Sequence, residues 1–490
     1  MNEFPYGGYV GGRWLRGEGQ EIRVEDPSSG SELARFPGLS PTQIESAVAA
    51  AREAFEESPW PRLAPRERVE RVGALVAALH RRADTIAERI VAEAGCPRTS
   101  HAMAMQVEVP LAHARQIAEL YLRLPEVEDN PLPLAERITP TGQLVQSLRR
   151  YAPVGVVAAI SAYNFPFYTA LWKVVPALLT GNAVILRPSP LTPLSALPLA
   201  EAAEEAELPP GVFNLVLEAG IEGGVLLSSH PGVDMIAFTG SSRVGVEIAR
   251  QAAPTMKRLQ LELGGKSAQI FLPDAVDRVV PAAVGVCLAH AGQGCALGTR
   301  LLVPEGAIPE LLPALAAAFS QIRVGPADDP ATQMGPVISA AQEARCAHFV
   351  AAAREGGGQV VAGGARPEGV PAGGHYFAPT LLHLPDNRNP AAQEEIFGPV
   401  VALIGYRDLD HAVAMANDSR YGLSGYVHGR DARTALDIAL RVRSGTVNVN
   451  TGLASAHVSS GGQRMSGVGR ERGVEGLRIY QQLTCINLGG

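Results

Sequence analysis

Lysine is scarce in this chain of 490 residues. Only Lys173, Lys257 and Lys266 occur, and arginine supplies the rest of the 42 basic residues. The three lysines either occupy positions that need a compact ammonium group or remain on the surface by chance. Basic residues form no run, and the 49 acidic residues bring the net charge to -7. We therefore expect no binding to nucleic acid, whose phosphates attract basic surfaces.

Cysteine is also infrequent. The five cysteines are odd in number and widely spaced, which argues against a disulfide framework, and no cluster of cysteine and histidine predicts a metal site. The first residues form no apolar segment of the kind found in signal peptides. The uncharged segment 151–172 contains Pro153, Gly155 and Pro166, which would interrupt a helix in a bilayer, so a buried strand and a loop are expected there. These features predict a cytoplasmic protein that does not bind membranes.

Two helices are expected before residue 100. Ser40 is a suitable N-cap, Pro41 fits the first helical position, and Gln43 completes a capping box. Apolar residues then recur at helical spacing. A second helix follows Pro65 and continues to Gly95. Both apolar stripes indicate core faces rather than cofactor contacts.

Short β-rich runs alternate with helical segments over the rest of the chain. Turns that contain proline and glycine separate the runs. This alternation predicts an α/β fold with a parallel sheet covered on both faces, and a second series from 280 to 460 predicts a second such domain. The C-terminal run 484–488 has no neighbour in sequence and is expected to pair elsewhere. The other expected strands lie around Tyr9 and Ile22 and at 154–160, 183–186, 213–216, 235–238 and 268–272.

The segment FTGSSRVG follows one expected strand and precedes a helical stretch. Gly240 permits a tight turn, Ser241 can cap the helix, and Gly245 completes the spacing GxxxxG. Backbone N–H groups at such a helix start can hold a phosphate. The spacing differs from the GxGxxG fingerprint of common dinucleotide-binding folds, so an ordinary helix start remains the alternative.

Four further motifs carry reactive or polar groups among small and apolar residues. They are SAYNFP with Asn164, LELGGKS with Glu262, HAGQGCALGTR with Cys295, and EEIFGPV with Glu395 and Phe397. In this order and spacing the chain resembles the aldehyde dehydrogenase superfamily, from GGRW near the N-terminus to SGVGRERG near the C-terminus. The resemblance implies an NAD(P)-dependent enzyme of the kind that releases a free acid, because the relatives that pass the acyl group to coenzyme A are expected to lack Glu262.

The resemblance also implies an architecture. An aldehyde dehydrogenase-like α/β fold has two Rossmann-type parallel-sheet domains and a small β oligomerisation arm. Here residues 1–128 and 152–260 would form the dinucleotide-binding domain, 261–463 the catalytic domain, and 129–151 with 475–490 the arm. The arm implies a homodimer or a homotetramer.

The chemistry of aldehyde oxidation explains the residue types. A thiolate adds readily to a carbonyl, and Cys295 is accessible because Gly294 and Ala296 flank it. The Asn164 amide can donate to the oxyanion, and two flanking leucines would raise the pKa of Glu262 towards the range of a general base. Considered separately, each residue also has a purely structural explanation: Cys295 as a buried thiol, Asn164 as a turn residue and Glu262 as a surface carboxylate. By resemblance Cys295 forms a thiohemiacetal and then a thioester, Glu262 activates water, and Lys173 relays protons or orients the site.

The expected cofactor site departs from the family at one segment. Arg187 and Pro190 stand where NAD-dependent relatives have lysine and glutamate. Loss of the carboxylate removes repulsion towards a 2′-phosphate, and arginine suits phosphate, which favours acceptance of NADP. Arg187 is weaker evidence for NADP than Pro190, because arginine replaces lysine throughout this chain. The expected cofactor-binding residues are Ser161, Tyr163, Arg187, Ser189, Pro190, Gly240, Ser241, Gly245, Leu263, Gly264, Glu395 and Phe397.

The substrate side is predicted to be wide. The loop 452–460 contains no aromatic, arginine or lysine side chain, so a semialdehyde that bears a carboxylate has no anchor in it. Two other functions stay open, namely a catalytically silent dinucleotide-binding relative and a cofactor-independent thiol esterase. Retention of Cys295 and Glu262 argues against the first, and Glu395 argues against the second. The expected pocket residues are Phe165, Phe167, Tyr168, Trp172, Gly294, Ala296, Leu453, His457 and Ser460.

Overall fold

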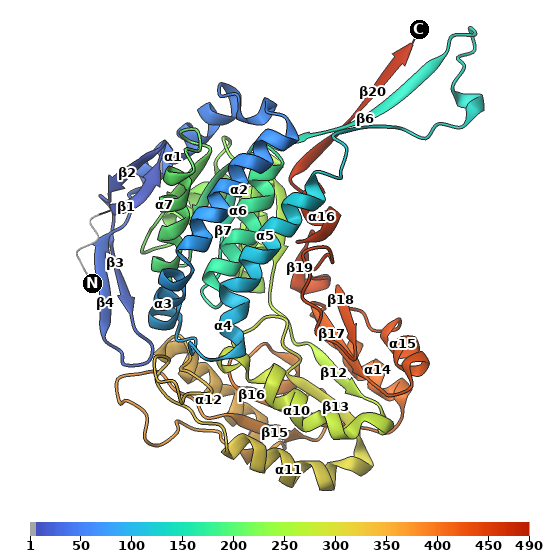
Figure 1. Cartoon of the computed structure of the whole chain (residues 1–490). Coiled ribbons are helices and arrows are strands. Elements are labelled where there is room, and N and C mark those ends of the chain that lie inside the picture. Colours follow the sequence, from blue (N-terminus) through green and yellow to red (C-terminus); the bar gives the residue numbers. More distant parts are fainter. Residues whose placement is uncertain (1–5, 490) are drawn as a thin grey trace.

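The computed structural model describes residues 6–489 and contains two large β-sheets, each covered by helices, with a narrow arm projecting from the body (Figure 1). The first sheet has eight strands in the order β19-β11-β10-β7-β8-β9-β1-β2. Its five inner strands from β11 to β9 run parallel, and β19, β1 and β2 are antiparallel additions at the edges. The strands are β1 (Tyr6–Val10), β2 (Arg13–Arg16), β7 (Val156–Ile160), β8 (Ala183–Arg187), β9 (Phe213–Val216), β10 (Met235–Thr239), β11 (Arg258–Glu262) and β19 (Gly467–Val468).

Helices cover both faces of this sheet because alternate side chains of each strand point in opposite directions. In β7, Val157 and Ala159 join one core cluster, whereas Val156 and Ala158 join another. The first face is covered by α2 (Pro65–Arg81), α3 (Ala83–Ala94), α4 (His101–Gln106), α5 (Glu108–Tyr121), α6 (Pro166–Leu179) and α7 (Leu197–Glu205), and the second by α1 (Pro41–Glu56), α8 (Glu222–Ser229) and α9 (Ser242–Ala252).

The second sheet has seven strands in the order β14-β15-β16-β13-β12-β17-β18, and all pairs except β14 with β15 are parallel. Its strands are β12 (Ala268–Phe271), β13 (Arg300–Pro304), β14 (Gln359–Ala362), β15 (Thr380–Leu384), β16 (Val400–Tyr406), β17 (Ser424–His428) and β18 (Thr446–Val449). The helices of this half are α10 (Val279–Ala282), α11 (Ile308–Ser320), α12 (Ala340–Glu355), α13 (Pro390–Gln393), α14 (Leu409–Asn417) and α15 (Ala432–Ala439).

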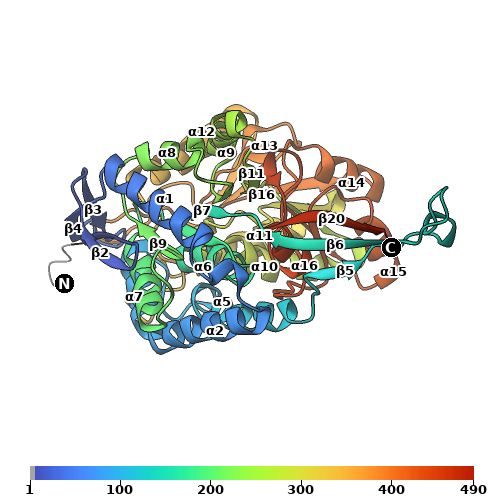
Figure 2. The same ribbon diagram turned by 90° about the horizontal axis from the view of Figure 1, so that it is seen from above.

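The arm is a three-stranded antiparallel sheet of β5 (Val127–Asp129), β6 (Val145–Pro153) and β20 (Gln481–Gly489). Figures 1 and 2 show β6 and β20 extending together away from the body. The expectation that the C-terminal strand pairs with a distant partner is thus confirmed, since β20 pairs with β6 along its whole length. The helix α16 (Gly473–Arg478) precedes β20, and a separate hairpin joins β3 (Glu21–Glu25) to β4 (Glu32–Pro37).

The helix signals read from sequence are confirmed at their ends but not throughout. Ser40 caps α1, and the capping box with Gln43 is present. The single helix expected between Pro65 and Gly95 is wrong, because Arg82 leaves helical geometry (φ -98°, ψ 9°) and divides the segment into α2 and α3. Gly95 ends α3 in the left-handed conformation (φ 66°), where a side chain would be strained.

All three lysines are buried, so they are not surface residues that remain by chance. Lys257 donates to the backbone carbonyl of Val233 at 2.8 Å and also contacts that of His230. Lys266 is fully enclosed, and burial lowers its pKa to about 7. Within residues 6–489 no helix has both the length and the apolar composition required to cross a bilayer.

Candidate active site

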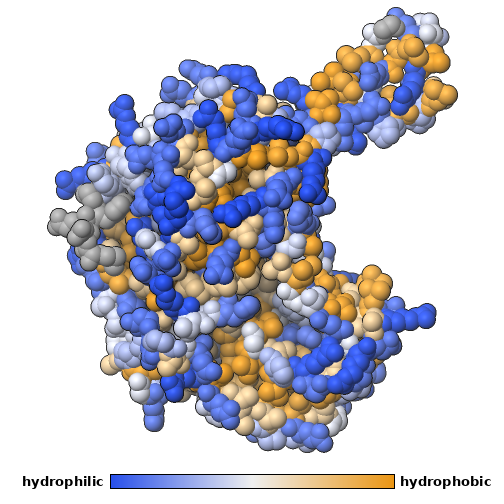
Figure 3. Space-filling model, viewed as in Figure 1, coloured by the Kyte–Doolittle hydropathy of each residue, from blue (hydrophilic) through white to orange (hydrophobic). Residues whose placement is uncertain are grey.

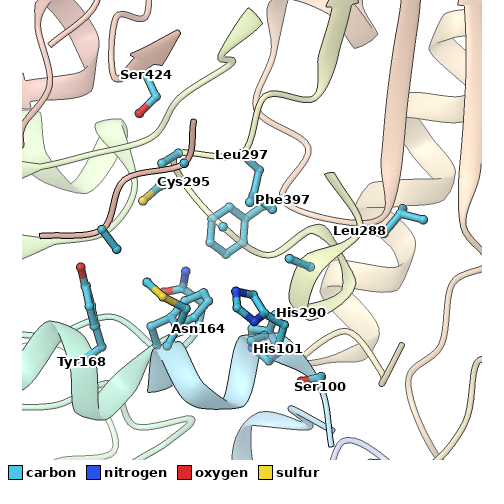
Figure 4. Close-up of a pocket in the computed structure, with 18 of the residues that line it drawn as sticks. Ser100, His101, Asn164, Tyr168, Leu288, His290, Cys295, Leu297, Phe397 and Ser424 are labelled. Atoms are coloured by element: carbon cyan, nitrogen blue, oxygen red, sulfur yellow. The ribbon is translucent and has the colours of Figure 1, made fainter. Parts of the chain in front are cut away.

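A cavity of about 680 Å³ lies between the two sheets and collects most of the reactive residues expected from sequence. Its walls come from the ends of β7, β10 and β11, from α4 and α6, and from the irregular segment before β13. Figure 4 shows Cys295, Asn164, Tyr168, His290 and Phe397 around a common space. Most of the wall surface is apolar, and polar side chains are interspersed in it, as in sites that bind small organic molecules.

Cys295 lies in the irregular segment and is partly exposed to the cavity. Just before it, His290 (φ 48°) and Ala291 (φ 53°) both adopt the left-handed conformation, which is strained for residues other than glycine and is typical of functional sites. Burial raises the pKa of the Cys295 thiol to about 12, and the carboxylates of Glu395 and Glu262 act in the same direction. The thiol is therefore protonated at neutral pH and must release its proton as it reacts.

Cys287 shows the contrasting environment of a structural cysteine. It is fully buried in the core beneath the second sheet. Its thiol donates to the carbonyl of Gly298 at 3.2 Å and accepts from the amide of Gln269 at 3.3 Å. The expectation that Cys287 behaves as a small buried residue is confirmed.

Asn164 follows β7 in the turn that leads into α6. Its side-chain Nδ2 donates to the backbone carbonyl of Gln293 at 2.8 Å, and its backbone carbonyl accepts from Gln106 Nε2 at 2.8 Å. The first bond holds the side-chain amide beside the segment that bears Cys295, and the second holds the backbone of the turn. Since an amide nitrogen carries two hydrogens, one donor remains for a bound oxygen atom.

Glu262 is the last residue of β11, and only 9% of its surface is exposed. Burial raises the pKa of its carboxyl group to about 8, and the carboxylate of Glu471 adds to the shift. Its Oε1 atom is buried without a hydrogen bond to any of the described residues. A carboxylate in this state is a stronger base than an exposed one, and Glu262 is among the residues that line the cavity.

Lys173 lies one layer behind the cavity wall. Its Nζ donates to Thr239 Oγ1 and to Glu471 Oε1, both at 2.6 Å, and both partners line the cavity. Sequence reasoning missed Glu471, although it stands in the recognised SGVGRERG motif. No local signal separates it from the neighbouring charges, because its partner Lys173 is 298 residues away.

Part of the expected cofactor site lines the same cavity. The Glu395 carboxylate accepts from the Gly265 N–H at 3.0 Å and lies so close to Gly264 that an added Cβ there would come within 2.2 Å of it. Phe397 has φ 62°, and its ring meets that of Tyr163 edge-on at 5.8 Å. Ser241 caps α9 as expected, accepting from the Val244 N–H. The lining members of the expected set are Gly240, Leu263, Glu395 and Phe397.

The remaining expected cofactor residues follow the carboxyl ends of parallel strands. Arg187, Ser189 and Pro190 are at the end of β8, and Ser161 and Tyr163 are at the end of β7. In open α/β sheets this edge binds dinucleotides, with helix N-termini such as that of α9 facing the phosphates. A partly buried carboxylate (Glu395) for sugar hydroxyls, glycines that allow close approach and a capped helix start fit a nicotinamide dinucleotide.

The expected substrate residues divide between the cavity wall and the packing behind it. Phe165, Tyr168, Gly294, Ala296, Leu453 and Ser460 line the cavity. The structure does not bring Phe167, Trp172 or His457 to the wall. Phe167 is fully buried on the core face of α6, since adjacent helical positions differ by about 100°. Trp172 packs behind Tyr168, and His457 is exposed.

Sequence reasoning also missed a second part of the wall. The start of α4, the π-helical turn η6 (Ala283–Cys287) and the loop after α11 supply it. Arg472 also lines the cavity and donates to Ser460 Oγ at 2.9 Å, so a cation is present although the loop 452–460 contains none. These missed residues include Ser100, His101, Met105, Gly285, Leu288, Ala289, Ile322 and Met334.

Comparison with known proteins agrees with this geometry. A family model described as "Aldehyde dehydrogenase family" matches residues 14–486. The chain belongs to the aldehyde dehydrogenase family. A geranial dehydrogenase of Castellaniella defragrans is 38% identical over 98% of each chain.

Solved aldehyde dehydrogenases share the fold over nearly the whole length. A mutant of aldehyde dehydrogenase C from Pseudomonas syringae, complexed with NAD+ and octanal, is 35% identical with a TM-score of 0.92, covering 98% of this chain and 96% of that chain. The Mycobacterium tuberculosis aldehyde dehydrogenase complexed with NAD+ is 38% identical with a TM-score of 0.90, covering 97% of this chain and 96% of that chain. The resemblance and the fold class inferred from sequence are confirmed. This aldehyde dehydrogenase oxidises an aldehyde to the carboxylic acid with NAD+ or NADP+ as electron acceptor.

Proposed function

We propose that Cys295, Asn164 and Glu262 carry out the oxidation at the cavity wall. The observation that carries this assignment is that a nucleophile, an oxyanion donor and a base from three distant segments line one cavity. The test is a screen of aldehydes with NAD+ and with NADP+, followed by the absorbance of the reduced nicotinamide. A silent relative would give no product, and a simple esterase would hydrolyse esters but reduce neither cofactor.

The first half of the reaction forms the adduct. Cys295 Sγ adds to the carbonyl carbon, and the thiol proton passes to solvent. The carbonyl oxygen becomes an oxyanion that the Asn164 amide and the backbone N–H of Cys295 stabilise. When bound, the nicotinamide ring supplies the two-electron acceptor that turns this thiohemiacetal into a thioester. Glu395 and Phe397 would hold the adjoining part of the dinucleotide.

The second half removes the acyl group. Glu262 accepts a proton from a water molecule, which attacks the thioester carbon. The C–S bond then breaks, the carboxylic acid leaves, and Cys295 is restored. Lys173 and Glu471 form an ion pair whose charges influence the pKa of Glu262 in opposite directions, so the pair tunes this base.

We infer from the cavity wall that extended apolar aldehydes are the preferred substrates. Met105, Leu288, Ile322 and Met334 contribute apolar side chains to the cavity wall, and burial of each additional methylene adds about 0.8 kcal/mol of binding energy. The names of two similar proteins refer to geranial and octanal, which are aldehydes of this class.

Narrowing the mouth of the cavity is expected to reverse this preference. Gly285 lines the cavity at an exposed position, and nothing lies within 4 Å of the site of a Cβ. Gly285→Phe should therefore fold normally and lower kcat/KM for octanal by about tenfold or more, while that for propanal changes little. Gly285→Ala should give a smaller effect. Equal losses for both aldehydes would contradict a role for this part of the wall.

Glu471 is expected to set the pH dependence of Glu262. Its negative charge raises the pKa of Glu262, so Glu471→Gln should lower that pKa and move the acidic limb of the kcat–pH profile to lower pH. Glu475→Gln, on the exposed side of α16, is a matched control that should leave the profile in place. An unchanged or upward-shifted limb for Glu471→Gln would contradict the coupling.

We also propose a homo-oligomer in the cytoplasm and the domain division expected from sequence. Large apolar side chains remain exposed on the arm, as Figure 3 shows, and a monomer would leave them in water. Leu483→Asp together with Leu488→Asp should lower the mass measured by light scattering, and an unchanged mass would contradict assembly through the arm. The exposed group is Val127, Leu134, Ile138, Leu144, Leu483 and Leu488.

A further inference from the structure

A buried ion pair occupies the strand edge where the adenosine half of the dinucleotide is expected. Arg187 is the last residue of β8, and Glu218 follows β9 by two residues. Strands β8 and β9 are parallel neighbours, so their carboxyl ends meet at one edge. Arg187 Nε donates to Glu218 Oε1 at 2.7 Å, and only 9% of Arg187 and 4% of Glu218 is exposed.

Further hydrogen bonds hold both side chains in place. Arg187 Nη2 donates to the carbonyl of Gly220 at 2.7 Å. The Glu218 carboxylate accepts the N–H of Gly223 at 2.7 Å and that of Gly224 at 3.0 Å, at the start of α8. Glu218 thus fixes the direction of the guanidinium and ties it to the neighbouring helix.

This ion pair changes what Arg187 and Pro190 imply for the preference between NAD and NADP. A free arginine at this edge would attract a 2′-phosphate through paired hydrogen bonds. Here the positive charge is already matched by a buried carboxylate, and moving the guanidinium away would leave the buried Glu218 charge without its cation, which is strongly unfavourable.

We infer that Glu218 is a specificity-determining residue that makes the enzyme bind NAD in preference to NADP. It acts through Arg187, by withholding the guanidinium from a 2′-phosphate. The inference rests on the proposed cofactor site at the ends of β8 and β9.

The test measures binding of each dinucleotide to the enzyme freed of cofactor, by titration calorimetry without aldehyde. The wild type should bind NAD+ at least tenfold more tightly than NADP+. Glu218→Gln keeps the shape and loses the charge, so it should narrow the ratio of the two Kd values by about tenfold, mainly through tighter NADP+ binding; tenfold corresponds to about 1.4 kcal/mol. The melting temperature reports whether the variant is folded.

Two controls separate this role from a structural one. Glu222→Gln removes an exposed carboxylate from the first residue of α8 and should leave the ratio nearly unchanged. The double variant Glu218→Gln with Arg187→Gln should lose the gain in NADP+ affinity, since no guanidinium is released. An unchanged ratio in Glu218→Gln, equal weakening of both dinucleotides, or a wild type that prefers NADP+ would overturn the inference while leaving the active site intact. Failure of the wild type to bind either dinucleotide would overturn the cofactor site as well.

Discussion

Cys295→Ala is expected to abolish aldehyde oxidation, with a loss of at least about 10³-fold in kcat at every pH. The reason is that the carbonyl then has no group with which to form the covalent adduct, whereas the cavity and the cofactor contacts stay in place. Steady-state production of reduced cofactor and the single-turnover burst should both disappear. Binding of NAD+ should persist, which shows that the variant is folded.

The matched control is Cys287→Ala. Cys287 lies in the core eight residues earlier, and its thiol donates a hydrogen bond to the carbonyl of Gly298. The variant should therefore lose some stability and keep most of its activity. Appreciable turnover by Cys295→Ala would disprove the covalent mechanism. Equal inactivation of both variants would show that the loss reflects damage to the fold. An esterase activity that survives in Cys295→Ala would belong to another site.

Glu262→Gln should retain the burst and lose steady turnover by about 10² to 10⁴-fold, the usual contribution of a general base. Glutamine has nearly the same shape but cannot accept a proton from water, so the thioester accumulates after one equivalent of reduced cofactor. Rapid mixing should resolve one burst per site followed by a nearly flat phase.

The pH dependence of the wild type provides an independent check on Glu262. Burial and Glu471 raise the pKa of this carboxyl group to about 8, and only its ionised form can act as a base. Steady turnover should therefore increase as the pH rises through about 8, and Glu262→Gln should lack this step. If the burst of Glu262→Gln disappears together with steady turnover, Glu262 is needed earlier, to take the proton of Cys295.

The sequence determined the features that depend on neighbouring residues. Ser40 with Gln43, Gly95 and Ser241 marked helix ends correctly, because caps and left-handed turns are local structures. The alternation of strand and helix gave the parallel sheets. The motifs around Cys295 and its partners indicated the family, since each motif is a short run of residues that can be recognised without knowledge of the fold.

Local sequence patterns did not show which face of a helix points towards the cavity. Tyr168 lines the cavity and Phe167 packs in the core, although both are aromatic and adjacent. Both faces of α6 are apolar, so the sequence contains no amphipathic pattern that would identify the face towards the cavity. The break of the expected helix at Arg82 was equally hidden, because apolar spacing continues across it.

Only the tertiary structure decided which charges meet. Lys173 finds Glu471 across 298 residues, and Arg187 finds Glu218 through a strand–helix–strand crossover. The sequence shows every one of these charges, but its spacing carries no information on contacts made by packing two sheets and their helices together. Burial then sets the chemistry, since the same carboxyl group is an ordinary acid in water and a base near neutral pH inside this cavity.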